Sequence, residues 1–431
     1  MGLGMNSLDQ HVITSPFVKG RQHQLKFQLI LSEASQLFNW QGSRATTLAD
    51  IAGTMSLTKT CLYYYVKNKE DLIHKCYVAS CEMWLRRAVE ASALKGSGLG
   101  KIIFMIGGHL QQYAATLRDE SPHFAMLTEV SSLNDECRQD IVKRWSEVFV
   151  LCRSMIEDGI EEGVIADLDP SVAALAIFSI IQWFPVWMNR KHAANASSVM
   201  ASVLSLVTNG LASEHHAFED VDFPAVGDVD PDSFNRDIQN YNKREAFYRV
   251  GSAYFNQKGY KGASLDEIAN SLDVTKGAFY YHIKNKEELL YQCFNRTLDL
   301  ENGLLSKAGE AGKAGIKKIE LSLRYLFHIQ FSDQGPLIRY RTLPSLGQDH
   351  RKRVLKATKE NSEKLGAYIR QGLIDGTVRN IDSEITQNLL SGAIEASPEL
   401  ADWLPNFRGQ DLSADYFYIF INGLSFKPIV D

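Results

Sequence analysis

A 30-residue segment occurs twice in this chain of 431 residues, and the repeat constrains the fold more than any other feature of the sequence. Residues 48–77 align with residues 265–294 without a gap, at a constant offset of 217 positions. Thirteen of the thirty positions are identical, and they include lysines, tyrosines and an asparagine as well as apolar residues. Because chance does not produce an ungapped match of this quality, the sequence predicts an internal duplication.

The pattern inside the repeat predicts two short helices joined by a tight turn, followed by a third helix. In the second copy, apolar residues recur at helical spacing from Leu265 to Leu272. Ser264 and Thr275 are suitable N-caps for the two short helices. Asn285 stands ahead of a helix with an acidic first turn. This layout is typical of a helix-turn-helix, whose second helix enters the major groove of DNA.

The duplication extends over each half of the chain. A long helix precedes each motif and is expected to end at Gly42 or Gly259. Residues 156–177 also match residues 369–390, at an offset of 213. Gly163 and Gly376, which are expected to end a helix, occupy corresponding positions in the two halves. Asp169 and Asp382, which are expected to begin the next helix, also correspond. Since strand signals are scarce, we expect an all-α fold with two tandem copies of a three-helix helix-turn-helix unit, each followed by a helical effector or dimerisation bundle.

These repeats divide the chain into six expected segments. The first half consists of a flexible basic arm (1–24), the first DNA-binding domain (25–75) and the first effector or dimerisation domain (76–212). An acidic, proline-bearing linker (213–237) follows it. The second half consists of the second DNA-binding domain (238–292) and the second effector or dimerisation domain (293–431). We expect His215 and His216 to be solvated linker residues rather than metal ligands.

Bulk properties exclude several classes of protein. The net charge of −5 means that DNA binding requires local clusters of cations. The longest apolar run, residues 172–188, is interrupted by polar residues and a proline, which favours a core helix over a membrane span. The six cysteines show no zinc spacing, and with no export signal visible we expect reduced thiols in a cytoplasmic protein. No nucleotide-binding, hydrolase or metalloprotease motif occurs, so we expect no catalytic residues, no metal and no cofactor.

Residues 275–289, TKGAFYYHIKNKEEL, closely resemble the DNA-binding signature of TetR-type (tetracycline-repressor-like) regulators. The preceding residues 265–269 also fit this signature. The first copy resembles it less closely, because Thr60 stands at the position of Gly277 and Tyr65 at that of His282. The resemblance implies a regulator that binds a double-stranded DNA operator and a small-molecule effector.

Candidate DNA contacts follow from the chemistry of phosphate and from this resemblance. Hydroxyl groups and free N–H groups at helix N-termini suit phosphate, and a lysine can reach a phosphate or a guanine edge. The resemblance adds phosphate contacts at the matching tyrosine, histidine and lysine. The candidates are Thr47, Thr58, Lys59, Thr60, Tyr63, Tyr64 and Lys69 in the first copy, and Ser264, Thr275, Lys276, Gly277, Tyr280, Tyr281, His282 and Lys286 in the second. We expect one tyrosine of each adjacent pair to pack beneath its motif, and Leu62 and Phe279 to be core residues.

The two motifs differ in charge. Residues 48–77 hold four lysines and three acidic residues, whereas residues 265–294 hold three lysines and five acidic residues. We therefore expect the first motif to contribute more of the salt-dependent affinity. Two reading heads in one chain also suggest that the halves pack as an internal pseudo-dimer through their last helices and read one imperfect palindrome. The alternative is a homodimer with four motifs.

Aromatic residues in the effector domains are candidates for an apolar ligand pocket. The candidates are Trp145, Phe149, Trp183 and Trp187 in the first half, and Tyr325 and Trp403 in the second. The competing interpretation places them in a packed core. The resemblance implies that a small, often hydrophobic ligand changes the separation of the reading heads and releases a repressor from DNA. Two alternatives stay open: a redox sensor on the same frame, and a regulator in which one motif binds DNA while the other serves dimerisation or a partner.

Overall fold

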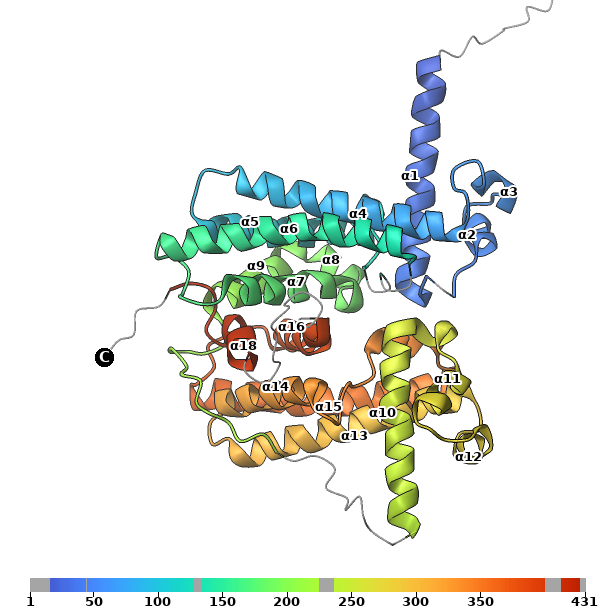
Figure 1. The fold of residues 1–431 in the computed structure, drawn as a ribbon. Helices are drawn as coiled ribbons and strands as arrows, with labels where there is room; N and C mark the ends of the chain where they lie inside the picture. The colour runs from blue at the N-terminus through green and yellow to red at the C-terminus, as the bar shows by residue number, and fades with distance from the viewer. Residues whose placement is uncertain are drawn as a thin grey trace, which may run out of the picture.

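The computed structural model describes residues 16–43, 45–127, 130, 133–224, 236–399 and 412–426. Within these residues the regular elements are all helical, and only two isolated β-bridges, Ile165–Ser425 and Ala212–Val378, are present. The all-α prediction is therefore confirmed, and the helix-turn-helix unit occurs twice (Figure 1).

Each half contains a small head domain followed by a helical bundle. In the first half the elements are α1 (Pro16–Gln41), α2 (Leu48–Thr54), α3 (Lys59–Leu62), α4 (Lys69–Ser92), α5 (Gly98–Leu117), α6 (Asp135–Glu161), α7 (Pro170–Trp187), α8 (Arg190–Ala194) and α9 (Ala196–Asn209). In the second half they are α10 (Arg236–Gly262), α11 (Leu265–Ser271), α12 (Lys276–His282), α13 (Lys286–Ala311), α14 (Gly315–Phe331), η2 (Tyr340–Ser345), α15 (Gln348–Asp375), α16 (Ser383–Ala396), η3 (Ser397–Glu399) and α18 (Ser413–Ile421).

The expected boundaries of the head helices agree closely with the structure. Thr58 caps α3 and Thr275 caps α12, each accepting a hydrogen bond from the backbone N–H three residues later. Leu62 and Phe279 are fully buried in the two head cores, as predicted. The predicted helix stops, Gly42, Gly163, Gly259 and Gly376, all have positive φ values between 66° and 84°. One expectation was wrong: residues 16–24 are the first turns of α1 rather than part of a flexible arm.

The two bundles share one hydrophobic core. Helices α7 and α9 of the first half pack against α16 and α18 of the second, and buried residues of all four helices belong to the same cluster. Figure 1 shows α16 and α18 lying between α7 and α14. In chain order, α16 of the second half corresponds to α7 of the first, and α18 corresponds to α9. The two halves therefore pack against each other through corresponding helices.

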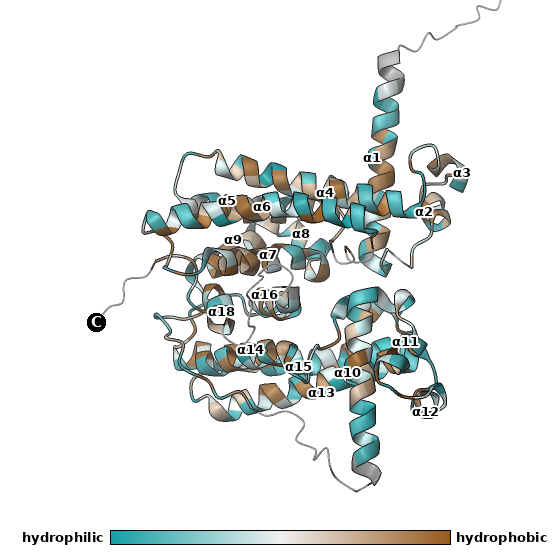
Figure 2. Ribbon diagram, in the orientation of Figure 1, coloured by the Kyte–Doolittle hydropathy of each residue, from teal (hydrophilic) through white to brown (hydrophobic). Residues whose placement is uncertain are grey.

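Helix α7 is apolar because it lies in this shared core. Among the described helices it alone is long and apolar enough to cross a membrane, but 67% of it is buried inside the protein. Figure 2 shows α7 largely in the hydrophobic colour and surrounded by other helices. The broken apolar run of the sequence is thus a core helix, as predicted.

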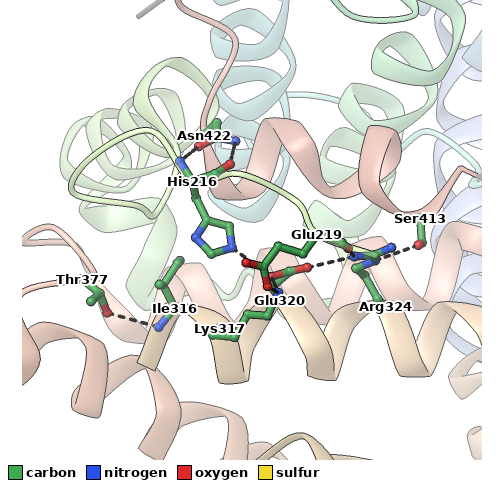
Figure 3. Close-up of polar contacts among 9 residues, drawn as sticks. All are labelled: His216, Glu219, Ile316, Lys317, Glu320, Arg324, Thr377, Ser413 and Asn422. Carbon is green, nitrogen blue, oxygen red and sulfur yellow. Dashed lines mark hydrogen bonds and ion pairs between the residues drawn. The ribbon is translucent and has the colours of Figure 1, made fainter. Parts of the chain in front are cut away.

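The described part of the linker, up to residue 224, packs against the second bundle. The backbone N–H of His216 donates to Asn422 Oδ1 (2.8 Å), and His216 Nε2 lies 2.9 Å from Glu320 Oε2 on α14 (Figure 3). Arg324 donates to the carbonyl oxygen of Glu219 (2.7 Å). The expectation of a solvated linker was therefore wrong for His216, because buried charges on α14 provide partners for this segment.

Paired glycines allow the helices of each bundle to approach closely. A Cβ at Gly315 would overlap the backbone of Gly372, and a Cβ at Gly98 would overlap the backbone around Gly159. In the first half this contact joins the start of α5 to the end of α6, and in the second half it joins the start of α14 to the end of α15. The same glycine-mediated helix contact therefore occurs in each half.

We predict that Gly315→Ala lowers the free energy of unfolding by about 1–3 kcal/mol or more, because the new methyl group meets backbone atoms that cannot rotate away. Gly303→Ala is the matched control. Gly303 lies on the exposed face of α13 with no atom near the new methyl group, so this change should stabilise the helix by about 0.5–1 kcal/mol. Urea unfolding of both variants measures the contrast, and equal stability of the two would contradict the packing described here.

Candidate nucleic-acid interface and cavities

The two short second helices of the motifs, α3 and α12, lie at the same edge of the molecule (Figure 1). The heads also touch one another, since Lys261 Nζ donates to the carbonyl oxygen of Ala45 at 3.1 Å. This bond joins residues 216 positions apart in sequence, one just before α2 and the other at the end of α10. The two heads are therefore in direct contact in this structure.

In the first head the candidate residues form an exposed surface around α3. Thr58, Lys59 and Thr60 are exposed, and 49% of Tyr63 and 75% of Tyr64 is accessible. The Lys59 ammonium lies 5.7 Å from the centre of the Tyr63 ring. Two aromatic hydroxyls and an ammonium group are therefore presented together on one face.

The second head exposes corresponding groups around α12. Tyr280 and Tyr281 are 46% and 81% exposed. The expectation that one tyrosine of each pair packs beneath its motif was therefore wrong. In the first head the neighbouring Tyr65 is the one that packs, stacking on His23 with ring centres 4.6 Å apart. Tyr63 and Tyr64 directly follow α3, whereas Tyr280 and Tyr281 lie on α12.

Lys276 of the second head forms an ion pair with Asp266, with 2.6 Å between Nζ and Oδ2. The hydrogen bond and the charge of Asp266 raise the pKa of Lys276. Ala49 stands at the position of Asp266 in the first head, so Lys59 has no corresponding carboxylate beside it. The charge asymmetry seen in the sequence thus acts directly at the lysine that begins each second helix.

Two further candidates in the second head are turned partly inward. Lys286 donates to the carbonyl oxygen of Lys261 (3.2 Å), lies 4.9 Å from the Tyr260 ring centre, and has its pKa lowered by burial. His282 packs near Phe247, and burial lowers its pKa, which favours a neutral ring near pH 7. In the first head, Lys69 begins α4 and is half-buried.

The remaining candidates are Thr47, Ser264 and Gly277, which lie at or near the starts of α2, α11 and α12. Thr47 closes a capping box with Asp50: Thr47 Oγ1 accepts from the Asp50 N–H at 3.1 Å, and the Asp50 carboxylate accepts from the Thr47 N–H at 2.8 Å. Ser264 precedes α11 without a side-chain cap bond. Gly277 has open space where a side chain would begin, so the threonine at position 60 of the first head fits the same backbone.

The first bundle encloses a small apolar cavity of about 70 Å³. Trp84, His109 and Trp145 line it, and the Trp84 and Trp145 rings meet edge to face with centres 5.1 Å apart. Burial lowers the pKa of His109 to about 3, so its ring is neutral at physiological pH.

The predicted pocket residues are not all in this cavity. Trp145 lines it, but Phe149 packs against Phe178 in the core, and Trp187 is buried against Phe184. Tyr325 is buried in the second bundle near Phe223. Trp403 lies outside the described residues. For Phe149, Trp187 and Tyr325 the competing interpretation, packed core, matches the structure.

Trp183 lines a much larger cavity, of about 430 Å³, between the two halves. Its walls include the ends of α1 and α10, and the segment around η2. No pattern in the sequence predicts this cavity. Arg339, Arg341 and Arg351 are a visible cluster of arginines in the sequence, but nothing local shows that they face the first half.

Family comparisons agree with the duplicated heads. The model of "Bacterial regulatory proteins, tetR family" matches residues 30–76 and again residues 248–293. The chain belongs to the TetR family. Its N-terminal domain occurs twice, and the model of the "Tetracyclin repressor-like, C-terminal domain" matches residues 107–211.

Relatives of this TetR-family chain each correspond to about half of it. The Transposon Tn10 TetC protein of Escherichia coli is 28% identical over 178 residues, which cover 39% of this chain and 89% of TetC. The "Fatty acid metabolism regulator protein" of Bacillus subtilis is 23% identical over 193 residues, covering 44% of this chain and 98% of that protein. The crystal structure of the TetR family transcriptional regulator PfmR from Thermus thermophilus has 20% identity and a TM-score of 0.34, covering 41% of this chain and 96% of PfmR.

The cysteines of this TetR-family chain differ sharply in exposure. Cys76, Cys81 and Cys293 are buried, and burial raises the pKa of each thiol to about 12, which makes them unreactive. Cys61 is exposed on α3, where a hydrogen bond from Thr58 (3.2 Å) lowers its pKa. Among the described residues no group of three or more His, Cys, Asp or Glu side chains is arranged to hold a metal ion.

Proposed function

We propose that this TetR-family transcriptional regulator reads one imperfect palindrome with both heads of a single chain, and that it is a cytoplasmic repressor released by a small hydrophobic ligand. The observation that carries the proposal is the pair of matching exposed surfaces on α3 and α12 at one edge of one molecule. In this view the 25–75 and 238–292 segments read DNA, and the bundles that follow hold the heads and the effector.

The exposed groups divide into two roles. Lys59 and Lys276 are the first residues of α3 and α12, where they can reach a phosphate or a guanine edge. The exposed hydroxyls of Tyr63, Tyr64 and Tyr280 are suited to phosphate, which positions the heads without reading sequence. Because the second helices differ in sequence, the two half-sites are expected to differ.

The small cavity of the first bundle is our candidate site for the hydrophobic effector. It is lined by Trp84 and Trp145 from helices α4 and α6, and α4 begins directly after the first motif. A ligand that separates these helices would move the first head relative to the second.

Removing an acidic residue from the second head, or adding one to the first, tests whether the charge difference between the heads affects DNA binding. Asp266→Ala is expected to raise operator affinity several-fold, because it frees Lys276 and removes a negative charge near the phosphates. The reciprocal variant Ala49→Asp gives the first head the carboxylate of the second and should lower affinity by a similar factor. Affinities measured over a range of salt concentrations check both changes. If both variants bind like the parent, neither lysine approaches DNA.

Selection of bound DNA from a random pool, with the mass of the complex measured on the enriched site, tests the proposal directly. We expect one chain on two dissimilar half-sites about one helical turn apart. A perfect palindrome bound by two chains would instead indicate that one motif of each chain reads DNA and the other serves dimerisation. Failure to enrich any sequence would contradict the proposal altogether.

A redox-sensing function is the second candidate, since Cys61 is an exposed thiol on α3 itself. Oxidation there would place a polar group at the proposed DNA surface. Peroxide should then weaken DNA binding by the parent chain but not by Cys61→Ser. Equal sensitivity of both would exclude this candidate.

A further inference from the structure

The cavity between the halves is formed by all four domains of the chain. The ends of α1 and α10 supply one side, with Trp40 and Tyr260 among the lining residues. Helix α7 supplies Trp183, and the second bundle supplies Tyr340 and Leu355. The volume, about 430 Å³, falls in the range of roughly 300–1,000 Å³ that is typical of small-molecule sites.

The charged residues that line this cavity are mostly cations. Among the described lining residues these are Lys258, Lys261, Arg339, Arg341 and Arg351, against the single carboxylate of Glu395. The backbone N–H of Tyr340 donates to that carboxylate at 2.8 Å, and burial raises the pKa of Glu395 to about 7. Even when it is fully ionised, this carboxylate offsets at most one of the five cationic residues.

The other walls are aromatic. The rings of Trp183 and Tyr340, one from each half, meet edge to face with centres 6.5 Å apart. Trp40 and Leu355 lie at more exposed positions, 70% and 41% accessible. A flat apolar molecule can contact rings from both halves at once, while its charged end meets the cationic residues.

We propose that the cavity between the halves binds an amphipathic anion, with a planar apolar body and one carboxylate, sulfonate or phosphate group. The small cavity of the first bundle, beside the neutral His109, suits an uncharged ligand instead. The two cavities thus differ in the charge of the ligand that they accept.

Binding between the halves would also set the spacing of the heads. The cavity wall includes Ala45 and Lys261, which form the direct hydrogen bond between the two heads. A ligand that fits only one separation of these residues biases the heads toward that separation. This consequence rests on the proposed DNA-binding function, but ligand binding itself does not.

The test uses two fluorescent probes that differ by one anionic group, with the full chain and without DNA. 1-Anilinonaphthalene-8-sulfonate carries a sulfonate, and N-phenyl-1-naphthylamine is its uncharged counterpart. We expect the sulfonate to bind more tightly. Arg351→Gln should weaken it about tenfold, the loss of one charge-assisted hydrogen bond, and weaken the uncharged probe far less. Arg351 also donates to the carbonyl oxygens of Pro344 and Leu346 (2.8 Å each), so the uncharged probe reports any change in the cavity wall itself. Arg353→Gln, at an exposed position on the same helix α15, is the matched control.

Two filling variants locate the bound probe. Leu355→Trp places a large ring in the cavity between the halves, at a position that is already partly exposed, and should abolish sulfonate binding. Met83→Trp fills the small cavity of the first bundle and should leave sulfonate binding intact. Equal affinity for the two probes, or loss of sulfonate binding in Met83→Trp rather than in Leu355→Trp, would overturn the proposal.

The consequence for DNA is measured separately on the selected operator. The sulfonate should change operator affinity of the parent chain but not of Leu355→Trp. If the probe binds as expected and operator affinity stays constant, the coupling to the heads is wrong. If the chain binds no DNA at all, the proposed regulatory function is wrong. The probe results still show whether the cavity between the halves binds an amphipathic anion.

Discussion

Reversing one charge on either second helix is expected to weaken operator binding by about 10²–10⁴-fold, the factor by which two linked sites exceed either one alone. The variants are Lys59→Glu in the first head and Lys276→Glu in the second. Both side chains are exposed at the start of their helix, so the heads should fold normally. Each variant leaves one working head, which should bind its half-site with the modest affinity of a single motif.

The comparison between the two variants separates the proposed function from its main alternative. Lys356→Glu, at an exposed position on α15 far from the motifs in sequence, controls for the change in net charge. Large losses in both head variants mean that both motifs contact DNA. A loss in Lys59→Glu alone would mean that the second motif serves dimerisation or a partner. Gel-shift titrations at one fixed salt concentration are sufficient.

The fold could be predicted from the sequence because its signals are local and occur twice. Caps at Thr58 and Thr275, and helix stops at Gly42 and Gly259, depend on neighbours within a few residues. The start of α1 was misplaced although the sequence carries a local start signal, since Ser15 directly precedes Pro16, the first residue of the helix.

The exposure of the candidate DNA contacts was only partly predictable, since it depends on the packing of each head. The sequence identified Lys59, Tyr64 and Tyr281, which are exposed, but it also identified Lys286, which donates to a backbone oxygen of its own head. The sequence did not predict which residues of the two halves contact each other. The cavity lined by Trp183 and Arg341 exists only because segments about 150 positions apart meet across the shared core.

The linker illustrates the same limit in physical terms. An acidic, proline-bearing sequence predicts a solvated segment, and a carboxylate on α14 looks like a surface residue. Glu320 is instead fully buried, and three side chains lie within hydrogen-bond distance of its carboxylate: His216 (2.9 Å), Lys317 (2.9 Å) and Arg324 (2.9 Å) (Figure 3). Only the folded chain brings His216 to this carboxylate.

Glu320→Gln is expected to lower the free energy of unfolding by about 3–5 kcal/mol, because it removes the carboxylate that pairs with the buried Arg324 and leaves Lys317 with Glu219 alone. Glu360→Gln is the matched control. Glu360 is exposed and forms a looser ion pair of 3.7 Å with Lys356, so its loss should change stability by no more than about 0.5 kcal/mol. Urea unfolding at neutral pH measures both variants.

The pH dependence tests the origin of this stabilisation. Burial alone would raise the pKa of Glu320, but hydrogen bonds from His216, Lys317 and Arg324 outweigh it and hold the pKa below its ordinary value. A depressed carboxylate pKa stabilises the fold above the pKa of the unfolded chain, and this contribution is lost as the pH falls through the folded value. The difference in stability between the parent chain and Glu320→Gln should therefore be largest near neutral pH and shrink on acidification below about pH 4.5, the ordinary value for glutamate. A difference that stays constant from neutral to acidic pH would show that the loss comes from altered packing and not from the charge of Glu320.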